Sequence, residues 1–207
     1  MDDSYLYSLS PDDFTRMKIV RGLKRAMESS RYGDVTVTAV CKLAGVQRST
    51  FYRLFDNLDD VVYWELSRLS AISIREAPAG GDWRDSIVRQ QTAYISHLKE
   101  ESEFFQRIHK EMSHTDYGAV YQSMRRYYAD QLRSFITKRR PDLLNRECEF
   151  AIEFFIYGTS NSIAAWAASG MKESPRFVAE NIQQCMPENL GTALQESVEA
   201  IGKDQVP

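Results

Sequence analysis

The segment 36–55 constrains the fold of this chain more strongly than any other part of the sequence. It contains two short runs of apolar residues at helical spacing, and Gly45 lies between them. Glycine adopts the positive φ of a tight turn without strain, and the small Ala44 before it allows two helices to approach closely. The pattern predicts a helix-turn-helix with helices at about 36–44 and 47–53. Its apolar side chains would form a small shared core: Val37, Val40, Leu43, Phe51 and Phe55.

The outward face of the second helix carries polar side chains. In a helix-turn-helix this helix enters the major groove of DNA, where such side chains can bond to base edges and phosphate oxygens. We therefore predict binding to double-stranded operator DNA through five residues of this helix: Arg48, Ser49, Thr50, Tyr52 and Arg53. The alternative at this point is a packed helical hairpin without a nucleic-acid partner.

Charge is distributed unevenly along the chain. The whole sequence of 207 residues has a net charge of -3, but residues 14–55 contain nine basic and two acidic residues. From residue 56 onward, 17 basic residues face 23 acidic ones. A basic head followed by an acidic body suits a head that meets phosphates and a body that does not.

The rest of the sequence predicts helices and no strand. The first helix begins at Ser10 and Pro11, a side-chain cap followed by a proline in the first turn. Breaks rich in proline, glycine or polar residues separate later helices, at 77–81, 114–118, 141 and 187. We expect an all-α fold of about nine or ten helices. It would comprise a three-helix helix-turn-helix domain at 10–56, a helical ligand-binding and dimerisation domain at 57–200, and a tail at 201–207.

Several positions around the turn match one known pattern together. They are Thr36-Val37, Ala44-Gly45-Val46, Thr50-Phe51-Tyr52, Phe55 and Asp59-Asp60. Over roughly residues 14–65 the chain resembles the amino-terminal domain of the TetR (tetracycline repressor-like) family of regulators. The resemblance implies a dimeric transcriptional regulator, most simply a repressor. It also implies DNA contacts at Arg48, Thr50, Tyr52 and Arg53, with Thr36 meeting a phosphate.

Two positions depart from the family pattern. Leu58 stands where the family usually has a lysine that contacts the DNA backbone, which predicts weaker binding. Gln47 replaces the usual serine cap of the recognition helix, and Ser49 could serve as the cap only if the helix began later.

The second half of the chain resembles one carboxyl-terminal subtype of the same family, which includes regulators associated with dihydroxyacetone-kinase operons. The residues that carry this resemblance run from Phe154-Phe155-Ile156-Tyr157-Gly158 through Ile163, Trp166 and Gly170 to Ser174-Pro175. The spacing of His97, Phe104 and Phe105 agrees with it.

The family resemblance implies two further partners. One is a second copy of the chain, paired through the last two long helices, whose apolar faces at 150–168 and 177–200 include Phe150, Phe154, Tyr157, Ile163 and Trp166. Burial within one subunit is the alternative for these residues. The other partner is a small-molecule effector held among the body helices. Its candidate contacts are Tyr94, His97, Phe105, His109, Tyr128 and Trp166, and ordinary core packing is the alternative for each.

Other classes of function lack their motifs in this sequence. The three cysteines and three histidines are scattered, so neither a metal site nor a disulfide framework is expected. We find no phosphate-binding loop, zinc helix or nucleophile elbow, so we expect no enzyme activity and no cofactor. No apolar run is long enough to span a membrane, and we expect a cytoplasmic protein.

A protein-interaction regulator with the same fold is the second functional hypothesis. Leu58 and the acidic body motivate it, because both would weaken direct binding to DNA. Such a protein would bind DNA weakly or not at all and would be controlled by a partner protein.

Overall fold

The structure, a computed structural model, describes residues 10–76, 82–112 and 119–203. Within these ranges the chain forms ten α-helices and two short 3-10 turns, and no strand. The all-helical prediction is therefore confirmed. The predicted breaks at 77–81 and 114–118, His114 and the last four residues lie outside the described ranges.

Three helices and one 3-10 turn form the head. They are α1 (Pro11–Ser29), η2 (Tyr32–Asp34), α2 (Val37–Ala44) and α3 (Arg48–Leu54). A capping box begins α1, since the Ser10 hydroxyl accepts from the Asp13 N–H while the Asp13 carboxylate accepts from the Ser10 N–H. The buried side of α1 packs mainly on α2 and also on α3 and α4.

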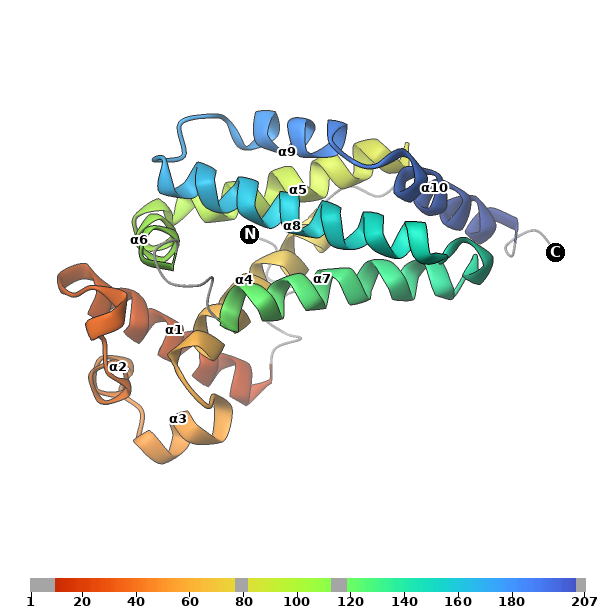
Figure 1. Ribbon diagram of the computed structural model, residues 1–207. Helices are drawn as coiled ribbons and strands as arrows, with labels where there is room; N and C mark the ends of the chain where they lie inside the picture. The colour runs from red at the N-terminus through yellow and green to blue at the C-terminus, as the bar shows by residue number, and fades with distance from the viewer. Residues whose placement is uncertain (1–9, 77–81, 113–118, 204–207) are drawn as a thin grey trace.

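The helix α4 (Leu58–Glu76) leads from the head into the body (Figure 1). The body then consists of α5 (Trp83–Glu100), α6 (Ser102–Met112), α7 (Ala119–Thr137), η3 (Pro141–Leu143), α8 (Arg146–Ala168), α9 (Pro175–Gln184) and α10 (Glu188–Lys203). Helix α5 packs on α4 and α9, while α7 packs on α4 and α8. Figure 1 shows α6 above the head and α10 at the far end of the body.

The buried side chains of head and body form one continuous cluster. It includes Leu23 of α1, Phe51 of α3, Leu66 of α4 and Ile152 of α8, all 5% exposed or less. Because α4 contributes to this cluster along its length, its position relative to the head is set by packing rather than by a free linker.

Two expectations about the carboxyl-terminal helices need correction. Helix α10 continues to Lys203, whereas the sequence predicted that it ends at about residue 200. Trp166 of α8 is buried, and its indole N–H donates to the Glu173 carbonyl at 3.2 Å. The Trp166 side chain is therefore packed within the subunit and is not available to a second subunit.

The described residues contain no cluster of three or more histidine, cysteine or acidic side chains that could hold a metal. None of the helices described is both long and apolar enough to cross a bilayer.

Candidate nucleic-acid interface

Gly45 makes the turn between α2 and α3. Its φ of 66° lies in the left-handed region, where a side chain would be strained. The turn is closed by backbone bonds, from the Gly45 N–H to the Lys42 carbonyl at 3.4 Å and from the Val46 N–H to the Cys41 carbonyl at 3.0 Å. These bonds satisfy carbonyls at the end of α2 and fix the direction in which α3 begins.

A small aromatic core holds α3 against the rest of the head. Phe51 is fully buried, and its ring centroid lies 5.9 Å from that of Phe55. Phe55 in turn meets Trp64 of α4 edge to face at 6.4 Å. Val40 is also fully buried, as predicted, but Leu43 is 42% exposed, so it does not belong to this core as expected. On α2 the Leu43 side chain faces solvent.

A glycine that sequence analysis did not single out allows α1 to pack on α2. A Cβ at Gly22 would lie 2.7 Å from the Val40 carbonyl oxygen and 2.9 Å from the Ala44 Cβ. Real Cβ atoms do not approach so closely, so only glycine fits here. The neighbours of Gly22 lie about twenty positions along the chain, and local spacing does not reveal them.

The outward face of α3 is exposed as predicted. Arg48, Ser49, Tyr52 and Arg53 are exposed, and Thr50 is half-buried. The Arg48 guanidinium lies over the Tyr52 ring, 5.9 Å from its centroid. The buried Phe51 below and the polar residues above give α3 the two-sided character that a groove-binding helix needs.

The two helix starts differ in their caps. The Thr36 hydroxyl accepts from the Ala39 N–H at 3.2 Å and caps α2. Thr36 itself is exposed. Helix α3 begins at Arg48 with Gln47 as its cap residue, and no side chain caps it. Ser49 lies inside α3, so the helix does not begin later and Ser49 is not its cap.

Leu58 has a packing role that explains its apolar character. It is the first residue of α4 and is half-buried against the hydrophobic cluster. The cap of α4 comes from Asn57, whose side-chain Oδ1 accepts from the Asp60 N–H at 3.0 Å. The aliphatic side chain of Leu58 is uncharged, so it adds no positive charge at the start of α4.

Arg53 makes a two-pronged ion pair with an acid of α1. Its Nη1 and Nη2 donate to Oδ2 and Oδ1 of Asp12, both at 2.9 Å. These hydrogen bonds lower the pKa of Asp12 and raise that of Arg53. One of the predicted DNA contacts is therefore already paired within the protein.

A buried carboxylate joins the head to the body. Glu65 of α4 is 1% exposed, and it accepts from Lys24 of α1 at 2.7 Å and from Arg68 at 2.6 and 2.9 Å. Burial opposes its charge, but the Arg68 hydrogen bonds and the Lys24 charge outweigh burial and lower the pKa of Glu65. Lys24 also pairs with Glu101 at the end of α5, and Arg107 of α6 donates to the Met27 carbonyl.

The six predicted effector residues have different surroundings in the body. Tyr94 and Tyr128 are hydrogen-bonded to each other, and burial raises the pKa of Tyr128 to about 12. His97 is half-buried, and its Nε2 is 2.8 Å from the Glu76 carboxylate. Trp166 is held by the Glu173 carbonyl. The effector site at these residues therefore stays a prediction.

Phe105 and His109 form a separate pair inside the body. Their ring centroids are 6.4 Å apart, and the His109 ring also lies 5.6 Å from that of Tyr121. Among the described residues neither nitrogen of His109 has a hydrogen-bond partner, and burial lowers its pKa to about 4. His109 is therefore neutral at pH 7 and packs as an aromatic residue.

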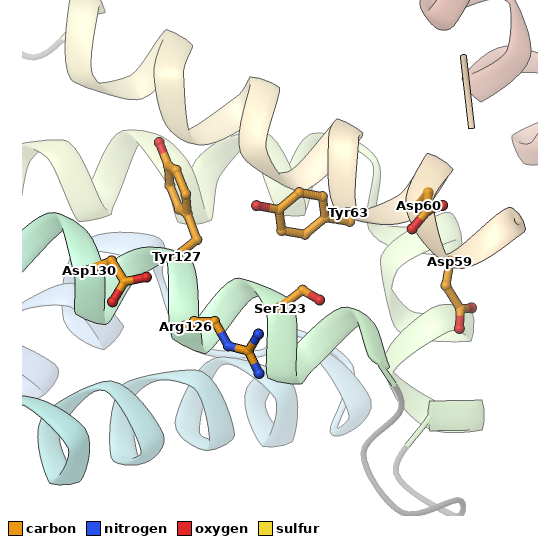
Figure 2. A pocket seen from close by; sticks show the side chains of 7 residues that line it. All are labelled: Asp59, Asp60, Tyr63, Ser123, Arg126, Tyr127 and Asp130. Atoms are coloured by element: carbon orange, nitrogen blue, oxygen red, sulfur yellow. The ribbon is translucent and has the colours of Figure 1, made fainter. Parts of the chain in front are cut away.

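A groove of about 380 Å³ lies between the start of α4 and α7 (Figure 2). Its lining is mainly polar and acidic: Asp59, Asp60, Tyr63, Ser123, Arg126, Tyr127 and Asp130. Asp59 also accepts from the Tyr32 hydroxyl of the head. None of the six predicted effector residues lines this groove, nor the two cavities near the start of α8.

Comparison with known proteins finds similar transcriptional regulators. Residues 89–188 match a protein family described as the C-terminal region of transcriptional regulators. A TetR-family transcriptional regulator from Streptomyces coelicolor has the same fold, with a TM-score of 0.53, 16% identity, and coverage of 91% of this chain and 90% of that one. Over residues 89–188 the chain is thus similar to transcriptional regulators, and its fold is that of a TetR-family regulator.

The chain is also similar to one particular activator. The activator DhaS of the dhaKLM operon of Lactococcus lactis is 22% identical over 105 residues, which cover 51% of this chain and 54% of that protein. A solved structure of a dihydroxyacetone kinase operon activator DhaS superposes with a TM-score of 0.52 and 16% identity, covering 86% of this chain and 97% of that one. The matched stretches span about half the length of the curated relatives.

Proposed function

We propose that the chain binds operator DNA as a homodimer, with α3 of each subunit in the major groove. The observation that carries the proposal is the two-sided α3, which is anchored by the buried Phe51 and presents Arg48, Ser49, Tyr52 and Arg53 to solvent. In this proposal residues 10–56 form the DNA-binding domain, residues 57–200 bind the effector and the second subunit, and Thr36 contacts a phosphate.

The proposed dimer uses α8 and α10. Phe150, Phe154 and Tyr157 of α8 are 74%, 63% and 47% exposed and follow one face of the helix. Phe150 and Phe154 also line a groove of about 540 Å³ that continues to Pro187 and Asn189 before and within α10. An exposed aromatic row of this kind marks an interaction surface, and a two-fold axis would bury it against its own copy.

Fluorescence anisotropy with the DNA upstream of the chain's own gene tests the DNA proposal. We expect salt-dependent binding that Arg48→Ala and Tyr52→Ala both weaken, because each removes a group from the outward face of α3. Arg176→Ala on α9 is the matched control, since Arg176 is an exposed arginine of the body. A footprint should show two half-sites about 34 Å apart, one turn of DNA. Equal binding by all variants would refute the proposal.

For the mode of action we propose repression that a small-molecule effector relieves by changing the separation of the two heads. The contacts of Lys24 with Glu65 and Glu101 support transmission through α4, because they join the head to both α4 and α5. An effector shifts the equilibrium only if it binds one head separation better than the other. Deleting the gene should raise transcription of its targets, whereas an activator such as the Lactococcus lactis relative would give a fall.

Control by a partner protein is the second candidate function. It is favoured by one observation, that none of the six predicted effector residues lines the three grooves described above. Titration with a saturating small molecule separates the two functions, because effector control requires a change in operator affinity. If the chain did not bind DNA, or if substitutions in α3 left its binding unchanged, the partner-controlled function would stand alone.

A further inference from the structure

The ion pair between Asp12 and Arg53 connects two elements that are far apart in the sequence. Asp12 lies in the first turn of α1 and Arg53 in the last turn of α3, 41 positions later. Both terminal amino groups of the guanidinium are engaged, each at 2.9 Å from a different carboxylate oxygen. The side chains remain 43% and 56% exposed, so the pair lies where a duplex bound to α3 could reach it.

The neighbouring acid does not share this role. Asp13 is engaged near its own helix start, where it accepts from the Ser10 hydroxyl at 2.8 Å and from Arg16 at 3.1 Å. Asp12 is the acid of this turn that pairs with the recognition helix. Since α3 contains two basic residues, Arg48 and Arg53, Asp12 offsets half of the positive charge on that helix.

Carboxylates and phosphates bind a guanidinium group in the same way, as paired acceptors in the plane of its N–H donors. A phosphate that approaches the end of the Arg53 side chain therefore meets donors that Asp12 already holds. It also meets the negative charge of the carboxylate, which repels it at any position close to the pair.

We propose that Asp12 sets the affinity of the chain for DNA by competing with a backbone phosphate for Arg53. This inference rests on the proposed DNA binding and adds to it a residue outside the helix-turn-helix. Because phosphate contacts carry no base information, Asp12 lowers binding to every duplex alike and leaves sequence preference unchanged.

The experiment compares the full-length wild type with Asp12→Asn, which keeps the side-chain size and removes its charge. Fluorescence anisotropy is measured with two labelled duplexes, the upstream region of the gene and an unrelated sequence. We expect Asp12→Asn to bind both duplexes about two- to fivefold more tightly, the range set by an exposed ion pair. The slope of log affinity against log salt should steepen by about 0.9, as for one additional phosphate contact.

Controls separate this effect from a general change of charge or stability. Glu28→Gln removes one negative charge from an exposed position at the other end of α1, and we expect a smaller gain for it. In an Arg53→Ala background the gain from Asp12→Asn should largely disappear, because the competed donor is absent. Asp12→Ser is a second charge-free variant, and thermal melting compares the fold of all proteins.

The outcomes distinguish this inference from the proposed function. Equal or weaker DNA binding by both Asp12 variants would overturn it, because Asp12 would then position Arg53 rather than compete for it. A gain that persists in full without Arg53 would also overturn it. If the wild type showed no salt-dependent binding to either duplex, the proposed function itself would fail, and the inference would fall with it.

Discussion

Replacing Glu65 with glutamine should destabilise the whole chain and not only the head. The side chain of Glu65 is 2% exposed, while those of Lys24 and Arg68 are 21% and 16% exposed. Removing one partner of a buried ion pair typically costs about 3–5 kcal/mol, because the remaining charge stays buried. Here the two cations keep some access to water and Lys24 keeps Glu101, so we expect a loss of about 2–3 kcal/mol.

The pH dependence of this loss provides an internal check. The folded chain holds the pKa of Glu65 below its ordinary value, so the unfolded chain takes up the proton first as the pH falls. The stabilisation is therefore complete above the pKa of a glutamate in the unfolded chain, about 4.3, and is lost as the pH falls through the lower folded-state value. The difference between wild type and Glu65→Gln should shrink over that window.

Urea unfolding followed by circular dichroism measures the effect, at one fixed protein concentration because association would contribute to stability. Glu103→Gln, an exposed acid of α6, is the control and should change the free energy of unfolding by less than about 0.5 kcal/mol. The reasoning is refuted if Glu65→Gln behaves like this control at neutral pH, or if its deficit is the same at acid pH.

Three further substitutions test other features. Gly22→Ala should cost about 1–3 kcal/mol by overpacking α1 against α2, whereas Gly33→Ala, where a Cβ meets open space, should be nearly neutral in the same urea assay. Gly45→Ala should cost about 1–2 kcal/mol because its φ of 66° strains an alanine, and a thermal melt that matches the wild type would contradict this. Phe154→Glu should yield monomers in analytical ultracentrifugation, while Ile74→Glu, at an exposed apolar position on α4, should not; a dimer that survives Phe154→Glu would argue against the α8 interface.

Features that depend on neighbouring residues were predictable from the sequence. Helix caps such as Ser10 and Thr36 and the turn at Gly45 lie within a few positions of the groups they bond, so residue type and spacing identify them. The all-helical class and the outward polar face of α3 follow from periodicity in the same way. The family resemblance added the roles of individual residues at that face.

Contacts between distant parts of the chain were not predictable in the same way. The pairs of Lys24 with Glu65 and of Arg53 with Asp12 each join residues 41 positions apart, and only the packing of α1 brings them together. The six effector candidates were chosen by residue type, and type does not say which side chains share a cavity. Leu43 and Trp166 show the same limit, since an apolar residue fits an exposed or a buried face equally well.

The packing of α6 against the head bears on how hybrid regulators are engineered. A fusion that joins this head to a foreign body at residue 56 or 57 keeps the recognition helix but discards Arg107, which bonds to the Met27 carbonyl, and Glu65, which neutralises Lys24. The transplanted head would expose the surface that α4 and α6 now cover. A hybrid that retains its operator preference must therefore include α4 and the head-facing side of α6 together with the first three helices.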